Sequence, residues 1–293
     1  MIKSILVPIE GQKDDVATLR MARELAVHFD AHLDCLYVRA DPAQIVTAGA
    51  AFPIGAGMIA GGVVDALRKE EEEKAKAAQA IFDDFCGLHD ISICDTPPGP
   101  GRISAAWHEA TGAAADLLTI WARTRDALIL GPRSPDGGFD PFSTGSILLG
   151  CGRPVFLPGP AAPTEPERPT TGTIAIAWKE TPEAARAVTA AMPLLAKAKK
   201  IVVISAVEAS DTAPGDPGKL VRQLGWHSFH AEGRTVTPAG QSASEAVMLD
   251  AVAAGTDFMI MGCYGHSRLR EFVFGGFTRE VLRGAPLPVF TFH

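Results

Sequence analysis

The chain has 293 residues, of which 47% are hydrophobic and 21% charged, and its formal net charge is -7 at pH 7. This length is sufficient for two compact domains of ordinary size. The acidic balance argues against nucleic acid as a partner, because phosphate backbones require a broad basic surface. The five cysteines are scattered and include no Cys-x-x-Cys pair, which indicates reduced thiols and a cytoplasmic protein.

The first half of the chain alternates the patterns of strands and helices. The opening apolar run that ends at Pro8 predicts a strand and not a secretory signal. The strands that we expect here cover residues 5–9, 33–38, 91–94, 127–130 and 155–157. The expected helices cover residues 14–29, 63–86 and 113–122.

One apolar stretch, residues 45–64, carries no charge and is long enough to resemble a membrane span. It contains five glycines and Pro53, and it has no basic flank on its N-terminal side. We therefore interpret it as an apolar loop and expect no membrane partner.

The second half repeats the alternation. Its expected strands cover residues 174–177, 201–207, 233–236, 258–261 and 289–292. Its expected helices cover residues 182–197, 219–224 and 242–254, and a short one begins near Phe277. Apolar strands separated by helices predict parallel sheets covered on both faces. The expected fold is thus α/β, with two tandem doubly wound parallel five-stranded sheets of Rossmann-like type.

The two halves also share sequence. Residues 125–131 read Arg-Asp-Ala-Leu-Ile-Leu-Gly, and residues 255–262 read Gly-Thr-Asp-Phe-Met-Ile-Met-Gly. Each motif is followed by a loop and then by Pro-Val-Phe. We therefore predict two copies of one domain, over residues 1–157 and 172–293, joined by a proline-rich linker over 158–171.

In doubly wound sheets, ligands bind outside the carboxyl ends of the strands. The loop that follows residues 258–261 contains Gly262, Gly265, Gly275 and Gly276, with Thr278 two residues later. Such glycines let backbone N–H groups approach a phosphate, and a helix N-terminus beside them favours an anion. His266, Ser267, Arg268 and Arg270 add polar groups to the loop. The glycines could equally serve only tight turns, so the spacing alone leaves both interpretations open.

On these residues the chain resembles the universal stress protein family in its tandem form, over almost all of both halves. The family pattern is Gly-x-x-Gly, nine residues, Gly and then Ser or Thr, and Gly262, Gly265 and Gly275 match it. The resemblance implies an adenine nucleotide alpha hydrolase-like fold and binding of ATP, with magnesium, in the second half. It assigns the phosphates to this loop and to Thr278, which matches a threonine common in the family, and it assigns adenine to Val207. We count His266 and Gly276 of the same loop among the candidate nucleotide-binding residues, although the family's hydroxyl contact is missing at Gly276.

The chain departs from the family in both halves. Lys179 stands where the family has an aspartate, and Gly276 stands where it has Ser or Thr. The first half keeps an acidic residue, Glu10, and has Val38 at the position matched to Val207, but its loop is shorter. Pro132 and Pro141 in that loop lack an N–H group. Its site is expected to be degenerate, with residues 143–145 only capping a helix.

The sequence does not favour a P-loop NTPase, an α/β hydrolase or a metalloprotein. The sequence has no P-loop and no Gly-x-Ser-x-Gly elbow, and His227 and His230 are read as surface residues, not metal ligands. Among the cysteines only Cys263 falls in the glycine loop. Trp107, Trp121 and Trp226 are expected in or beside helices, in the core or at an interface.

Two functions stay open. One is a stress-response protein that binds ATP or a related adenine nucleotide and signals to unknown protein partners, with at most slow hydrolysis because no general base is evident. The other is a nucleotide-free scaffold of the same fold that acts through protein contacts, which Lys179 and Gly276 favour. The family resemblance also implies that the final strands pair, so that the two halves form an internal pseudo-dimer. Association of two chains into a homodimer is left open.

Overall fold

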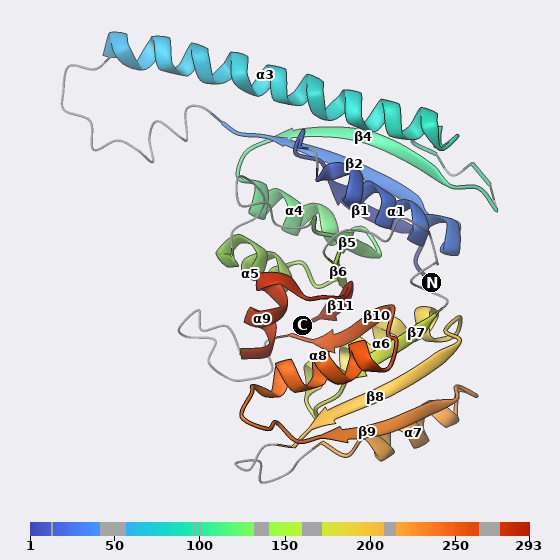
Figure 1. Ribbon diagram of the computed structural model, residues 1–293. Coiled ribbons are helices and arrows are strands. Elements are labelled where there is room, and N and C mark those ends of the chain that lie inside the picture. Colours follow the sequence, from blue (N-terminus) through green and yellow to red (C-terminus); the bar gives the residue numbers. More distant parts are fainter. Residues whose placement is uncertain are drawn as a thin grey trace.

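The computed structural model describes residues 1–12, 14–41, 57–96, 98–99, 101–131, 141–159, 172–207, 215–263 and 276–293. Its strands form one sheet that runs through both halves of the chain (Figure 1). The strands follow the order β3-β4-β2-β1-β5-β6-β11-β10-β7-β8-β9. Neighbouring strands are parallel, except that β6 and β11 pair antiparallel. The α/β class is therefore confirmed, although the two halves share a single sheet.

The first half contributes six strands and the second half five. Those of the first half are β1 (Ser4–Pro8), β2 (His32–Arg39), β3 (Ser92–Ile93), β4 (Ser104–Thr111), β5 (Ala127–Ile129) and β6 (Val155–Leu157). Those of the second half are β7 (Thr173–Ala177), β8 (Lys200–Ala206), β9 (Ala231–Val236), β10 (Phe258–Gly262) and β11 (Val289–Phe292).

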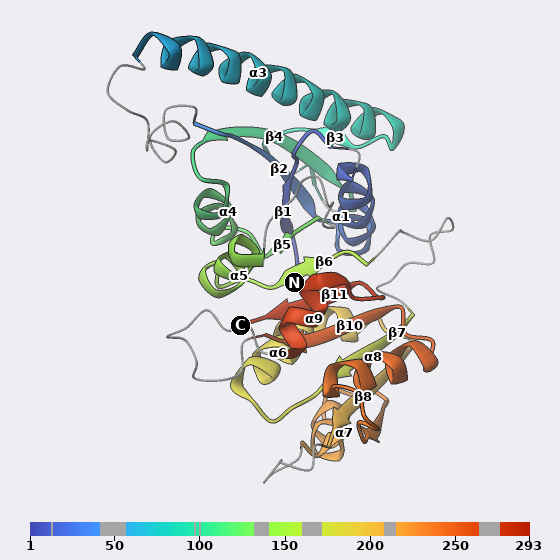
Figure 2. The same ribbon diagram turned by 60° about the vertical axis from the view of Figure 1, so that its left-hand side comes forward.

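Helices cover both faces of the sheet (Figure 2). One face packs against α1 (Asp15–Phe29), α3 (Gly57–Leu88), α6 (Pro182–Leu195) and α7 (Pro217–Gly225). The other packs against α4 (Ala114–Ala122), α5 (Pro141–Gly150), α8 (Ala243–Ala253) and α9 (Gly276–Gly284). Within the described ranges, no helix combines the length and the apolar character needed to cross a membrane.

The strand β4 was missed from the sequence. It pairs with β2 over eight residues, whereas the expected strand at residues 91–94 shortens to the two-residue β3 on the outer side of β4. The segment lacks a clear apolar alternation because His108 and Glu109 interrupt it. His108 Nε2 contacts Asp34 Oδ1 at 3.0 Å, and Arg125 binds both oxygens of Asp34 at 2.8 and 2.9 Å. This polar network on one face of the sheet compensates for the missing apolar pattern.

The tryptophans follow the expectation in part. Trp107 packs against the core as expected, but it lies on a strand, β4, where it stacks with Tyr37 and makes a tilted contact with Phe82 of α3. Trp226 lies beside a helix as expected, directly after α7, and its 89% exposure excludes the core and leaves the interface alternative.

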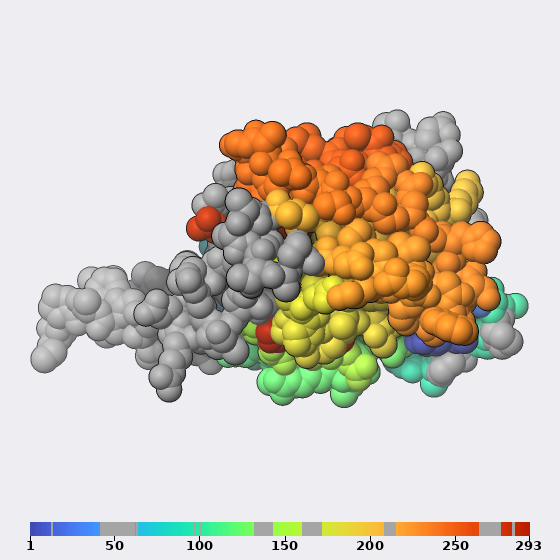
Figure 3. Space-filling view, turned by 90° about the horizontal axis from the view of Figure 1, so that it is seen from below, coloured from blue at the N-terminus to red at the C-terminus, as the bar shows by residue number. Residues whose placement is uncertain are grey.

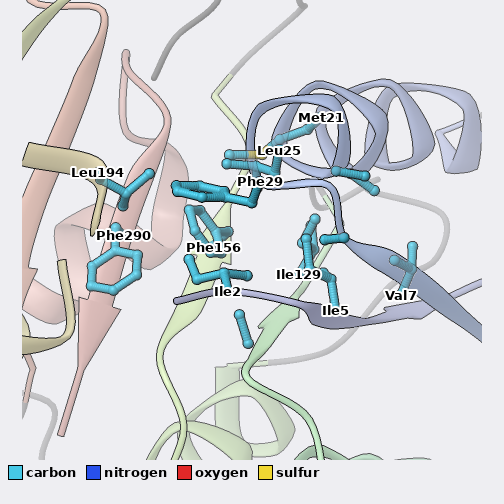
Figure 4. Close-up of a cluster of buried hydrophobic side chains, with 14 of the residues drawn as sticks. Ile2, Ile5, Val7, Met21, Leu25, Phe29, Ile129, Phe156, Leu194 and Phe290 are labelled. Carbon is cyan, nitrogen blue, oxygen red and sulfur yellow. The ribbon is translucent and has the colours of Figure 1, made fainter. Parts of the chain in front are cut away.

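The two halves meet where β6 and β11 pair. Phe156 on β6 contacts Phe290 on β11 edge to face, with ring centroids 5.0 Å apart, and lies 5.8 Å from Phe258 on β10. Phe29 and Leu194, at the C-terminal ends of α1 and α6, extend this contact above the strands (Figure 4). Lys197 adds a hydrogen bond from Nζ to the carbonyl oxygen of His28 at 2.8 Å. The prediction that the final strands bring the two halves together is confirmed.

The repeated aspartates of the shared motif, Asp126 and Asp257, have the same structural role. Asp126 Oδ2 accepts the backbone N–H of Lys3 at 2.7 Å and that of Ser4 at 3.1 Å. Asp257 Oδ2 accepts the N–H of Thr173 at 2.7 Å. Each carboxylate thereby fixes the start of the central strand of its own half.

Replacement of either aspartate by alanine should destabilise the protein by about 1–3 kcal/mol, because the N–H of the central strand loses its charged acceptor. Asp126→Asn and Asp257→Asn should lower the free energy of unfolding by less, since the amide oxygen of asparagine still accepts the hydrogen bond from the backbone N–H. Urea unfolding measures both changes, with the exposed Asp84→Ala as the control. Equal losses for the alanine and control variants would contradict this role.

Candidate functional site

The candidate site lies at the carboxyl edge of the sheet in the second half. The strand order reverses there, because β8 lies on one side of β7 and β10 on the other. The ends of β7, β8 and β10 place Lys179, Val207 and Gly262 along this edge. The helices α6 and α9 follow β7 and β10 along the chain, so their N-termini lie at the same edge. The topology therefore brings together the strand-end residues that the sequence singled out.

Gly262 packs directly against the first turn of α6. A Cβ atom at this position would lie 2.4 Å from the amide nitrogen of Ala184 and 2.6 Å from the carbonyl carbon of Glu183. Both contacts involve backbone, which cannot move aside without shifting the helix. Gly262 is therefore required by the fold, whether or not a phosphate binds.

The equivalent residue of the first half, Gly131, is constrained in a similar way. Its Cβ would lie 2.7 Å from Oγ1 of Thr18 on α1. In both copies of the motif this glycine thus faces the helix that follows the first strand, but Gly131 meets a side chain whereas Gly262 meets helix backbone, so the requirement for glycine is stricter at Gly262.

Lys179 lies at the exposed turn between β7 and α6, where it is the counterpart of Glu10. Ile9 donates its backbone N–H to the carbonyl oxygen of Leu36, and Trp178 donates its N–H to that of Ile204. These hydrogen bonds are equivalent in the two halves, so the residues that follow Ile9 and Trp178, Glu10 and Lys179, are equivalent as well.

Next to Lys179, Glu180 holds the segment that leads into α7. Glu180 Oε1 accepts hydrogen bonds from Lys219 Nζ at 3.0 Å and from the N–H of Asp216 at 3.3 Å. Gly215 is buried, and a Cβ there would lie 3.4 Å from the carbonyl oxygen of Trp178. This segment therefore lies across the ends of β7 and β8, a contact that the sequence did not reveal.

Val207 and Val38 do not occupy equivalent positions, which corrects the match made from sequence. The registers pair Ile5 with Leu33 and Ile174 with Ile201. Counting along the strands from these pairs makes Ala206 the counterpart of Val38. Val207 is one residue further on, half-buried, with its N–H bonded to Val236 O at 2.9 Å.

The helix α9 begins at Gly276, close to the expected start, and its Thr278 is 5% exposed. Glu280 on α9 accepts a hydrogen bond from the Ser242 hydroxyl at 3.0 Å and one from Ser244, which fixes α9 to the N-terminus of α8. Other predicted residues of the loop lie outside the described residues, namely Gly265, His266, Ser267, Arg268, Arg270 and Gly275.

Cys263 is not a reactive thiol. It is 1% exposed, and burial raises its pKa to about 12. A thiol with such a pKa carries almost no thiolate at neutral pH, and the thiolate is the nucleophile. No group of three or more metal-ligating side chains is arranged to hold an ion within the described ranges.

In the first half, the loop after β1 folds around a carboxylate of the chain itself. Asp15 is 5% exposed and accepts the backbone N–H groups of Glu10, Gly11 and Gln12, the last two at 2.7 and 2.9 Å. Donors that could face a bound anion are thus used internally. Residues 132–140 lie outside the described residues, and Ser143 and Thr144 lie within α5 instead of capping it, because the helix already begins at Pro141.

Burial, followed by repulsion from Asp15 and Asp14, raises the pKa of Glu10. A raised carboxyl pKa means that the folded state holds the proton more tightly than the unfolded state, so stability is lost as the pH rises through that range. Glu10→Gln should therefore raise the unfolding temperature near pH 7, and this gain should disappear at about pH 4.

Thermal unfolding at the two pH values measures this effect, with the exposed Glu73→Gln as the control. An equal gain at both pH values would contradict the electrostatic explanation.

Comparison with known proteins adds to this geometry. No family model matches the chain. A 51-residue stretch is 41% identical to a universal stress protein from Synechocystis, and it covers 17% of this chain and 18% of that relative's length. A universal stress protein from Archaeoglobus fulgidus has the same fold over 99% of this chain and 97% of its own, with a TM-score of 0.69 at 14% identity. The resemblance to universal stress proteins, in tandem form, is confirmed.

Two structures from Pseudomonas aeruginosa also match over almost the full chain. A putative universal stress protein covers 99% of this chain and 93% of its own, with a TM-score of 0.51 at 16% identity. The match to a protein of unknown function covers 99% of this chain and 92% of that protein, with a TM-score of 0.54 at 16% identity. At these identities the similarity of this universal stress protein-like chain concerns the fold alone.

Proposed function

We propose that the second half of the chain binds ATP or a related adenine nucleotide, with magnesium, and that the protein acts in a stress response. The observation that carries this proposal is the meeting of Lys179, Val207 and Gly262 at the switch point of the sheet, next to the start of α9. Such switch points are where doubly wound sheets bind their ligands. In this proposal residues 1–157 and 172–293 are the two domains, and 158–171 is their linker.

The nucleotide would extend along the carboxyl edge of the sheet. Its phosphates would bind the glycine loop, through Gly265, His266 and Gly275, and the first turn of α9, through Gly276 and Thr278. Its adenosine would lie towards Lys179 and Val207, beside the segment at Gly215 and Asp216 that crosses the ends of β7 and β8. The Lys179 ammonium can also contact a phosphate, although it cannot accept hydrogen bonds from ribose hydroxyls as a carboxylate does. The proposed activity is binding and not rapid turnover.

The second candidate is a nucleotide-free scaffold. The packing of Gly262 against α6 favours the scaffold, because the fold requires a glycine at this position even when no nucleotide binds. Lys179 favours it as well. The two candidates differ in a single measurable property, the affinity for the nucleotide.

Isothermal titration with magnesium ATP should show saturable binding of one nucleotide per chain. Gly265→Val should weaken it at least about tenfold, because a side chain in the loop keeps the phosphate from the backbone N–H groups. Ser134→Val, at the corresponding position of the first half, should leave the affinity unchanged. Gly262→Ala is unsuitable, since it would disturb α6.

Lys179→Asp tests the adenosine end of the site and should strengthen binding, because a carboxylate can accept from ribose hydroxyls. Absence of binding at millimolar ATP by the natural chain, with binding by the Lys179→Asp variant, would establish the scaffold instead.

A further inference from the structure

The two ends of the eleven-stranded sheet are built differently. At the first end, β3 covers the start of β4 by pairing Ser92 with Ser104 and Ile93 with Ala105, whereas residues 106–111 of β4 have no strand of the described residues on their outer side. The chain after β3 then contains Pro97, Pro98 and Pro100. At the other end, no strand of the described residues lies beyond β9. Edge strands are usually kept from pairing by shortness, by proline, by charged side chains or by cover. β9 has six residues and no proline, and its charged residues, Glu232 and Arg234, are of opposite sign.

The outward groups of β9 follow from its bonds to β8. Val207 N donates to Val236 O, and the register pairs Ala206 with Val236. In a parallel ladder the residues that bond to one neighbour alternate with those that face away. The N–H and C=O groups of Ala231, Gly233 and Thr235 therefore point to the open edge.

The side chains of β9 are complementary to those of a second β9. The strand reads Ala-Glu-Gly-Arg-Thr-Val, so an acidic and a basic residue flank Gly233. In an antiparallel pair related by a two-fold axis at Gly233, each Glu232 lies opposite Arg234 of the partner subunit. Both are on the α8 face of the sheet, where they already form an ion pair with each other at 2.5 Å and where Glu232 also pairs with Lys200.

The register of such a pair is also consistent with its hydrogen bonds. Gly233 would exchange both bonds with its own copy, and Ala231 would exchange bonds with Thr235 of the partner subunit. Glu232 and Arg234 would then fall in the non-hydrogen-bonded pairs, in which side chains lie closest together.

The surface beside this edge also has the character of an interface. Trp226 ends α7 just before β9, and its side chain is 89% exposed. Figure 3 views this end of the molecule, which is formed largely by residues of the second half. Exposed tryptophans are enriched among the residues that dominate binding at interfaces.

We propose that β9 pairs antiparallel with β9 of a second copy of this chain, around a two-fold axis at Gly233. The opposite charges on either side of Gly233 favour this partner, because a two-fold pair places each Glu232 opposite Arg234 of the other copy and so matches both charges at once. The chain already uses the same arrangement internally, where β6 and β11 pair antiparallel. This inference does not depend on nucleotide binding.

Sedimentation velocity over a concentration series tests the proposal with the full-length protein. The natural chain should form dimers as its concentration rises. Thr235→Pro should abolish dimers while keeping the fold, because it removes an outward N–H group and no bond to β8. Thr235→Val is the matched control and should dimerise normally.

Charge reversal tests the register. Glu232→Arg and Arg234→Glu should each weaken dimerisation about tenfold, because each places like charges opposite one another in both symmetric pairs. The double variant should restore it. The double variant also restores the ion pair within one chain between positions 232 and 234. An equimolar mixture of the two single variants keeps like charges within each chain but places Arg opposite Glu between copies, so dimers in that mixture report only the contact between copies.

A natural chain that stays monomeric at every concentration would overturn the proposal. So would a dimer that Thr235→Pro leaves intact, or a double variant that dimerises no better than the single ones. Circular dichroism of every variant separates loss of the dimer from loss of the fold.

Discussion

The antiparallel pairing of β6 with β11 is the contact on which the rest of the structure depends. It converts two parallel sheets into one, and Phe156, Phe258 and Phe290, which meet at this pairing and pack against helices of both halves, are completely buried. Burial of three phenylalanine side chains stabilises the folded state by about 5–9 kcal/mol, at 1.5–3 kcal/mol each. This contribution is comparable to the whole stability of an ordinary domain.

The internal repeat reflects packing more than ligand binding. Asp126 and Asp257 bind the first residues of the central strands, and Gly131 and Gly262 allow the neighbouring helices to approach. These residues were visible as a repeat in the sequence, but their role was not. The sequence alone does not show whether a glycine is needed for contact with a helix or for contact with a phosphate. The contacts of Gly262 with Ala184 and of Gly131 with Thr18 show that helix packing involves both glycines.

Much of the fold could be predicted from the sequence, because the buried strands and amphipathic helices have strong local patterns. The strand β4 escaped because its polar residues, His108 among them, are balanced by Asp34 and Arg125, which are distant in the sequence. The candidate site was predicted in outline only. The contact between Glu180 and Lys219 joins residues 39 positions apart, and the mismatch of Val38 with Val207 became visible only through the strand register.

The central claim, that the pairing of β6 with β11 makes one cooperative unit, is tested most directly by following the unfolding of each half separately. Trp107 and Trp121 lie in the first half and Trp178 and Trp226 in the second, so replacing either pair by phenylalanine leaves fluorescence from the other half. Urea unfolding of the two variants, with circular dichroism as a common reference, should give coincident midpoints by both probes in each variant. Fluorescence that changes at a different urea concentration from circular dichroism would show that the halves unfold independently, and would contradict the account.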